Sequence, residues 1–263
     1  MNKALSTGSS GRLAVLLGAG GIRGCAHAGA LVTLEEYGVR PEITVGASIG
    51  SLFGAAYAAG WSVDRIAAMV FDAPKRAVAE FYSNRLRIDR GTHIGSILMD
   101  LGDETRIEDL PKCFACMAID QESGEVRAFS RGPLLQALQA SIALPRIARP
   151  VVIDGRRYID GGLKGPIPSI VARDLGATAI IRVELTGWRG SATRHGKRRQ
   201  PPLIASASRY STVPSVVGAT SSDEWAVTPR FFGLSCNSPF GAVFAYRRGE
   251  KAMRRHMEQF EVG

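Results

Sequence analysis

The pentapeptide Gly46-Ala47-Ser48-Ile49-Gly50 has the pattern of a serine nucleophile on a sharp turn between a strand and a helix. An apolar run, residues 43–45, precedes it, and small and apolar residues, 52–59, follow with helical spacing. The two glycines leave room for neighbouring backbone at such a turn and tolerate strained φ/ψ angles. Ser48 is therefore expected at a helix N-terminus, where the helix dipole, roughly half a positive charge, favours a developing oxyanion.

A serine hydrolase also needs hydrogen-bond donors for the negative charge that grows on the attacked carbonyl oxygen. The glycine-rich segment between the first apolar run and the first helical segment reads Gly18-Ala19-Gly20-Gly21-Ile22-Arg23-Gly24. Backbone N–H groups at the start of a helix lack intrahelical partners and can converge on one oxygen. This segment is therefore predicted to form an oxyanion hole.

Dinucleotide binding is a competing interpretation of the same segment, because Gly18 and Gly20 begin a G-x-G-x-x-G pattern after a predicted strand. Arg23 stands where the third glycine is required. A large side chain there would obstruct the helix–sheet contact that glycine permits. A nucleotide-binding regulator or oxidoreductase is therefore the less favoured alternative.

The proton acceptor is harder to find, because none of the four histidines (His27, His93, His195 and His256) has a convincing catalytic setting. His27 falls on the first predicted helix and is expected to be a partly buried, hydrogen-bonded imidazole. Asp160, in Tyr158-Ile159-Asp160-Gly161-Gly162, follows a short predicted strand and is the better candidate base. Taken alone, an Asp-Gly pair is more typical of a plain turn.

Three separated segments together resemble the motifs of the patatin-like phospholipase family. Gly20 to Gly24 is similar to the family's glycine-rich loop, Gly46 to Gly50 to its G-x-S-x-G, and Asp160-Gly161-Gly162 to its D-G-G. Ala140 to Pro145 is similar to the family's approach to its acid. The order and spacing agree, and the resemblance covers about residues 12–185. Ala19 is a departure, because it stands where the family's run of three glycines would begin.

The resemblance implies a Ser–Asp dyad, in which Ser48 attacks an acyl ester and Asp160 accepts its proton with no intervening imidazole. It assigns the amides around Gly20 and Gly21 to the oxyanion hole, and Arg23 to fixing this loop or contacting a phosphate. The implied reaction is cleavage of lipid or phospholipid esters through an acyl-enzyme, with no metal and no cofactor. A patatin fold used for regulation or lipid binding, with little turnover, is the alternative.

The elements that must position these groups alternate between strand and helix, which indicates an α/β fold with a largely parallel central sheet flanked by helices. At 263 residues and 45% apolar composition, one domain is expected. Strands are predicted at 12–17, 43–45, 113–119, 126–129, 151–153, 156–159, 178–185 and 224–228. Helices are predicted at 24–37, 52–59, 63–71, 134–142, 167–175 and 247–260.

Residues 1–11 are polar and are interpreted as a flexible N-terminus, with the hydrolase domain at 12–263. Residues 188–222 show no clear period and are interpreted as a mobile loop or lid. The apolar stretch that begins at Leu13 breaks at Gly18, so no export or membrane-spanning segment is evident.

The formal net charge is +9, with basic clusters at 194–199 and 247–255. This excess fits peripheral contact with an anionic membrane, although a solvated basic surface explains it equally well. Nucleic acid is not expected as a partner, because no recognition motif is present.

Four cysteines are too few for a disulfide scaffold and favour a cytoplasmic protein. Cys113 and Cys116 should face opposite sides of a strand, which argues against a metal site.

Overall fold

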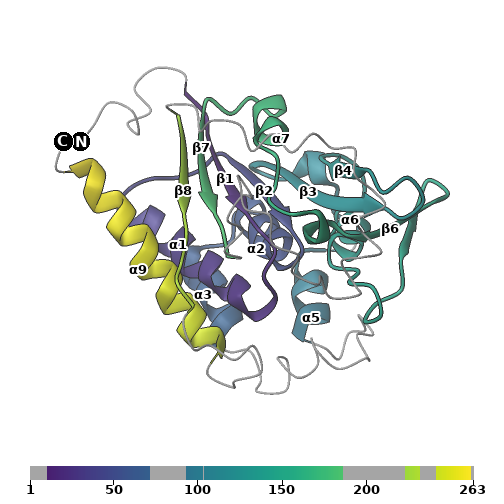
Figure 1. Ribbon diagram of the computed structural model, residues 1–263, viewed down its shortest axis with the longest axis horizontal. Coiled ribbons are helices and arrows are strands. Elements are labelled where there is room, and N and C mark those ends of the chain that lie inside the picture. Colours follow the sequence, from purple (N-terminus) through teal and green to yellow (C-terminus); the bar gives the residue numbers. More distant parts are fainter. Residues whose placement is uncertain (1–10, 72–92, 103, 186–222, 232–240, 262–263) are drawn as a thin grey trace, which may run out of the picture.

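A computed structural model describes residues 11–71, 93–102, 104–185, 223–231 and 241–261 (Figure 1). The predicted flexible N-terminus lies outside these residues except for Gly11, and the predicted loop or lid at 188–222 lies wholly outside them.

The centre of the fold is an eight-stranded sheet with the order β5-β6-β3-β2-β1-β7-β8, in which β4 also pairs with β3. The pairings along β3-β2-β1-β7-β8 are parallel, whereas β4, β5 and β6 pair antiparallel. The largely parallel sheet expected from the sequence is confirmed. The strands are β1 (Leu13–Leu17), β2 (Ile43–Ala47), β3 (Cys113–Asp120), β4 (Val126–Phe129), β5 (Val151–Ile153), β6 (Arg156–Asp160), β7 (Ala179–Val183) and β8 (Glu224–Val227).

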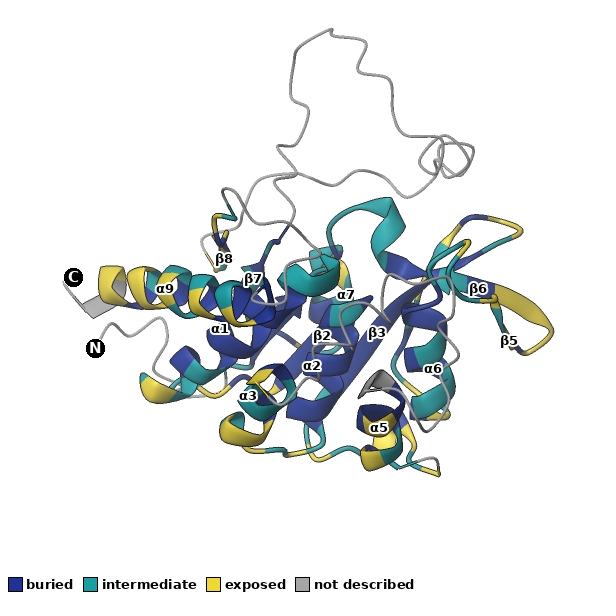
Figure 2. Cartoon of the chain, turned by 90° about the horizontal axis from the view of Figure 1, so that it is seen from below, coloured by how far each residue is buried: buried dark blue, intermediate teal, exposed yellow. Residues whose placement is uncertain are grey.

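Helices cover both faces of this sheet, with α7 on the opposite side from α1, α2 and α6 (Figure 2). The helices are α1 (Cys25–Glu36), α2 (Ile49–Ala58), α3 (Val63–Phe71), α5 (His93–Asp100), α6 (Leu134–Ser141), α7 (Ser169–Asp174) and α9 (Gly241–Glu261). Short 3-10 helices are η1 (Gly21–Gly24), η2 (Ile107–Asp109) and η3 (Gly161–Lys164). This layered arrangement is the expected α/β fold.

The central strands are rich in apolar residues because side chains on both of their faces are buried, and β1 is apolar at every position. In β1, Val15 and Leu17 belong to a cluster with residues of α1, α2, α3 and α9, whereas Ala14 and Leu16 pack toward α7. The same alternation places Cys116 and Cys113 of β3 in different clusters. The prediction that these two cysteines face opposite sides is therefore confirmed.

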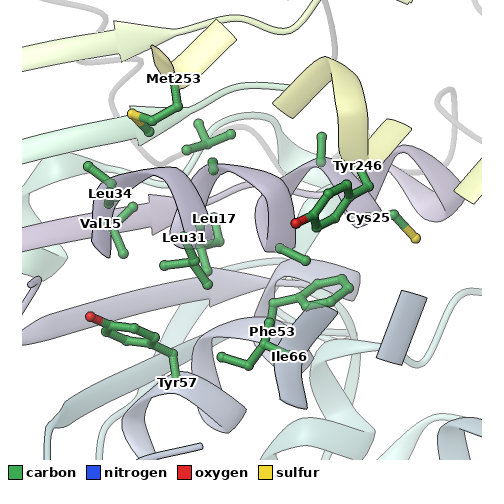
Figure 3. Close-up of a cluster of buried hydrophobic side chains, with 14 of the residues drawn as sticks. Val15, Leu17, Cys25, Leu31, Leu34, Phe53, Tyr57, Ile66, Tyr246 and Met253 are labelled. Atoms are coloured by element: carbon green, nitrogen blue, oxygen red, sulfur yellow. The ribbon is translucent and has the colours of Figure 1, made fainter. Parts of the chain in front are cut away.

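Helix α9 packs across α1 with almost no space between the two backbones. A Cβ atom at Gly29 would lie 2.2 Å from the carbonyl oxygen of Tyr246, and one at Gly249 would lie 2.0 Å from that of Ala26. Figure 3 shows the cluster beneath this crossing, to which Tyr246 and Met253 of α9 contribute buried side chains. Among the described elements, the last helix thereby covers the first α-helix.

Several predicted elements agree with the structure to the residue, including β4, β5 and α3. Helix α9 is a correction, because it begins at Gly241 and not at Arg247. Its first turns carry the buried Ala242, Ala245 and Tyr246, whose apolar character hid the helical period from the sequence. Helix α5 was not predicted. No helix within the described residues is both long enough and apolar enough to cross a membrane.

Candidate active site

Ser48 lies between β2 and α2, on the sharp turn that the sequence predicted. Its φ of 54° and ψ of −130° are strained for a residue with a side chain. The turn is tight because the flanking glycines meet backbone directly. A Cβ atom at Gly50 would lie 1.9 Å from the carbonyl oxygen of Leu17, and one at Gly46 would lie 2.3 Å from the Cα of Ser51.

Asp160 ends β6, whose antiparallel pairing with β3 sets Asp160 opposite Ala118. The β5–β6 hairpin turns at Asp154 and Gly155, both with positive φ, as the sequence predicted for an Asp-Gly turn. The Oγ of Ser48 donates a hydrogen bond to Oδ2 of Asp160 at 2.6 Å, with no imidazole between them. The structure therefore brings together the two side chains that the resemblance paired.

Both members of this pair are buried, with 6% of Ser48 and 3% of Asp160 exposed. Burial raises the pKa of Asp160 to about 6, against the hydrogen bonds from Ser48 and from the Gly162 amide, which favour the carboxylate. The Gly162 amide donates to Oδ1 at 2.7 Å, so Oδ2 is left to face the serine. The carboxylate is thus a stronger base than an exposed aspartate, and its Oδ2 atom is oriented toward Ser48.

The glycine-rich loop comes between β1 and α1 and contains η1, with Gly20 preceding the 3-10 turn. Gly21 has a φ of 55°, a conformation that glycine adopts without strain. Neither the Gly20 amide nor the Gly21 amide donates to another described residue. Ala19 has no positive φ, so its methyl group causes no backbone strain in the loop.

The remaining residues of this loop have different surroundings. Ile22 packs against the cluster beneath α1, and the guanidinium of Arg23 lies 5.4 Å from the ring centre of Phe231. The buried Nε of Arg23 makes no hydrogen bond within the described part of the chain. Gly24 ends η1 immediately before α1.

Close glycine contacts join the three motifs into one site. A Cβ atom at Gly24 would lie 2.2 Å from the side chain of Ile49, directly after the serine. A Cβ atom at Gly162 would lie 2.1 Å from that of Ala19 in the glycine-rich loop. Gly161 is equally confined, because its Cβ would lie 2.1 Å from the carbonyl oxygen of Met117 in β3. Loop, serine turn and acid turn therefore share one location.

Ser141, at the end of α6, is a site residue to which the sequence assigned no role. Its fully buried Oγ accepts a hydrogen bond from the backbone N–H of Ser48 at 3.1 Å. Two residues later, the carbonyl of Ala143 accepts the N–H of Asp160 at 3.0 Å. The resemblance of residues 140–145 to the family's approach to its acid marked this segment, but it gave Ser141 no role. This segment braces both halves of the Ser–Asp pair.

Replacing Ser141 with alanine should leave the Ser48 amide buried without a partner, which costs about 1–3 kcal/mol of unfolding free energy. The strained turn would also relax, lowering kcat for ester hydrolysis by roughly 10- to 100-fold. Ser51→Ala is the matched comparison. It removes the hydroxyl that donates to the carbonyl oxygen of Ser48, but this oxygen still accepts a hydrogen bond from the Ser51 amide. Kinetics and thermal unfolding of both variants check this. Equal effects would contradict the assigned role.

His27 is fully buried on α1 and not partly buried as the sequence suggested. Its Nε2 lies 2.7 Å from the carbonyl oxygen of Gly18, and burial lowers its pKa to about 4. His93 begins α5 and His256 lies on α9, whereas His195 lies outside the described residues. Among the described residues, no group of three or more His, Cys, Asp or Glu side chains is arranged to hold a metal ion.

Comparison with known proteins identifies the family of this chain. Residues 15–173 match the family model described as Patatin-like phospholipase. The chain belongs to the patatin-like phospholipase family. An uncharacterized NTE family protein of Mycobacterium tuberculosis is 33% identical over 189 residues, which are 71% of this chain and 52% of that protein. A patatin-like phospholipase domain-containing protein of Caenorhabditis elegans is 33% identical over 181 residues, 66% of this chain and 13% of that protein.

The patatin-like fold is also seen in the crystal structure of VipD from Legionella pneumophila. That structure aligns with 96% of this chain and 67% of its own, with a TM-score of 0.57 and 14% identity. The chain spans about half the length of the mycobacterial relative and a smaller part of the nematode one. Membership in the patatin-like phospholipase family supports a lipid hydrolase in general terms.

Proposed function

We propose that this chain is a serine acyl hydrolase that cleaves carboxylic esters of lipids or phospholipids through an acyl-enzyme. The observation that carries the proposal is the 2.6 Å hydrogen bond from Ser48 Oγ to the buried carboxylate of Asp160. A serine hydroxyl becomes an effective nucleophile when a positioned base removes its proton. The patatin-like family supports a lipid as the acyl donor.

In the first half-reaction, Ser48 Oγ bonds to the ester carbonyl carbon while its proton passes to Oδ2 of Asp160. The negative charge moves to the carbonyl oxygen, for which the Gly20 and Gly21 amides are the candidate donors. Collapse of this intermediate breaks the ester bond, and the protonated Asp160 returns its proton to the departing alkoxide. The products are an alcohol and an acyl group bound to Ser48.

In the second half-reaction, Asp160 takes a proton from water as the water oxygen attacks the acyl carbon. Breakage of the bond to Ser48 releases a carboxylic acid, and the proton on Asp160 returns to the serine oxygen. Asp160 is therefore base and acid in turn. Its pKa of about 6 suits both roles near neutral pH better than the pKa of an ordinary aspartate, 3.8.

Covalent labelling combined with hydrolysis tests this proposal. A fluorophosphonate probe should modify Ser48, located by peptide mass spectrometry, and the unlabelled protein should release fatty acid from phospholipid or lysophospholipid. A regulatory or lipid-binding protein with little turnover predicts lipid binding with neither labelling nor release. Activity on a nitrophenyl ester without Ser48 labelling would contradict the Ser–Asp mechanism.

Peripheral contact with an anionic membrane is a second part of the proposal, and the exposed face of α9 is its candidate surface. Arg247, Lys251, Arg254 and Arg255 are exposed there. Arg247 pairs with Glu250 at 2.9 Å and Arg254 with Glu36 at 2.6 Å, which reduces the net charge of this face. We therefore expect a weak preference for anionic vesicles, about 1 kcal/mol for each of Lys251 and Arg255.

Sedimentation with anionic and neutral vesicles checks this preference. The double variant Lys251→Glu and Arg255→Glu should sediment equally with both kinds of vesicle, while its hydrolysis of a water-soluble ester stays unchanged. A wild-type protein that shows no preference for anionic vesicles would remove this part of the proposal and leave the hydrolase part intact.

A further inference from the structure

His27 is the buried titratable group at the site that the dyad mechanism does not use. It lies in the first turn of α1, fully enclosed, with Nε2 2.7 Å from the carbonyl oxygen of Gly18. A carbonyl oxygen only accepts hydrogen bonds, so Nε2 must carry the proton. Nδ1 is then bare, and it makes no hydrogen bond within the described residues. The imidazole is therefore neutral, with its one N–H group directed at Gly18.

Gly18 is the residue from which the glycine-rich loop leaves the sheet. Its amide donates to the carbonyl of Val183 in β7 at 3.4 Å, and its carbonyl accepts from His27. The same carbonyl borders the serine turn, because a Cβ atom at Gly50 would lie 2.9 Å from it. The peptide group before Gly18 is thus held by the sheet, whereas the Gly18–Ala19 peptide that follows is held by His27 of α1 and borders the start of α2.

The Gly18–Ala19 peptide is trans, as are all peptide bonds of the described residues. In a planar trans peptide the C=O and the following N–H point in opposite directions. A Gly18 carbonyl directed toward His27 therefore directs the Ala19 amide away from His27. Ala19 itself touches Gly162, whose amide holds Asp160. The imidazole thus acts on the start of the loop that also carries the Gly20 and Gly21 amides.

We propose that His27 is a positioning residue for the oxyanion loop, its Nε2–H anchoring the Gly18 carbonyl so that the following amides face the substrate oxygen. This inference rests on the proposed hydrolase function. It assigns His27 no proton transfer and no contact with substrate. The bare Nδ1 agrees with this role, because anchoring requires a single donor and the other nitrogen does nothing.

Two substitutions separate anchoring from packing. His27→Leu keeps a similar apolar volume and removes the donor, whereas the side-chain amide of His27→Gln supplies an N–H group near the position of Nε2. For a soluble nitrophenyl ester, His27→Leu should lower kcat roughly 10- to 100-fold with KM nearly unchanged. His27→Gln should recover most of that loss. Equal kcat values in the two variants, or a change confined to KM, would overturn the inference.

Nuclear magnetic resonance supplies a readout that does not depend on activity. The ring nitrogens of His27, assigned by comparison with His27→Gln, should show a proton on Nε2 alone from about pH 8 down to about pH 5. The amide signals of residues 19–21 should shift in His27→Leu and stay close to wild type in His27→Gln. A proton on Nδ1, or unmoved loop signals in His27→Leu, would overturn the inference. An inactive wild type with both expected spectra would instead defeat the proposed hydrolase function.

Discussion

Replacing Ser48 with alanine is expected to lower kcat/KM for ester hydrolysis by at least roughly 1,000-fold. The alanine keeps the Cβ atom, so the turn between β2 and α2 stays as strained as before. What disappears is the Oγ atom, which donates a hydrogen bond to Asp160 Oδ2 and is the proposed nucleophile. The Gly20 and Gly21 amides, proposed as oxyanion donors, remain and account for any residual rate.

This prediction is measured with a soluble nitrophenyl ester and with phospholipid, alongside fluorophosphonate labelling. Ser123→Ala is a suitable control, because Ser123 is exposed in the turn before β4 and is far along the chain from the three motifs. The control should keep wild-type rates and labelling. Undiminished hydrolysis in Ser48→Ala at an unchanged unfolding temperature would mean that another residue is the nucleophile.

Replacing Asp160 with asparagine is expected to have two effects of opposite sign. Hydrolysis should fall by at least roughly 1,000-fold, because the amide cannot accept the proton of Ser48. Stability at neutral pH should rise, because the wild-type fold holds a buried carboxylate whose pKa is raised from 3.8 to about 6, with burial as the main cause. A pKa shift of this size corresponds to about 3 kcal/mol of unfolding free energy.

The pH dependence follows from the direction of that shift. Below pH 3.8 the carboxyl group is protonated in both the folded and the unfolded chain, so its burial carries no ionisation cost. Between pH 3.8 and about 6 the unfolded chain is ionised while the folded chain still holds its proton, so the folded state loses stability over this range. The advantage of Asp160→Asn should therefore be fully developed near pH 8 and vanish toward pH 4. Denaturant unfolding of both proteins at several pH values measures it.

The hydrolysis rate of the wild type should also depend on the ionisation of Asp160, but it should increase over the pH range in which stability decreases. The rate should increase as the pH rises through about 6, because only the ionised Asp160 accepts the serine proton. A pH–rate profile of kcat/KM checks this expectation. A flat profile across this range, or an asparagine variant less stable than wild type at pH 8, would contradict a buried, catalytically active carboxylate.

The pairing of Ser48 with Asp160 could be predicted from the sequence, but the contacts that brace this pair could not. Ser48 was recognisable because its glycine pattern serves a local backbone requirement, whereas Asp160 was assigned its role through the family resemblance of its D-G-G segment. Ser141 has no such pattern, since its role depends on a contact between residues 93 positions apart in the chain. The complete burial of His27 has a similar origin, because it results from the packing of α1 between the sheet and a distant helix.

Element boundaries were predictable where the apolar period was regular and unpredictable where another feature obscured it. The strands β4 and β5 are bounded by clear turn residues, and both were placed correctly. Helix α5 is short and contains Gly95, which weakens its helical signal. The start of α9 was missed because its first residues face α1 and are apolar, whereas its basic residues come later.

The close crossing of α1 and α9 has a consequence for how the protein is made. Chains are synthesised from the N-terminus, so the serine turn and the glycine-rich loop leave the ribosome long before residues 241–261 exist. Until those residues emerge, the small-residue groove of α1 around Gly29 has nothing to fill it. The groove of α1 is therefore covered later in synthesis than the serine turn and the loop are made, and until then the nascent chain exposes apolar surface that favours aggregation.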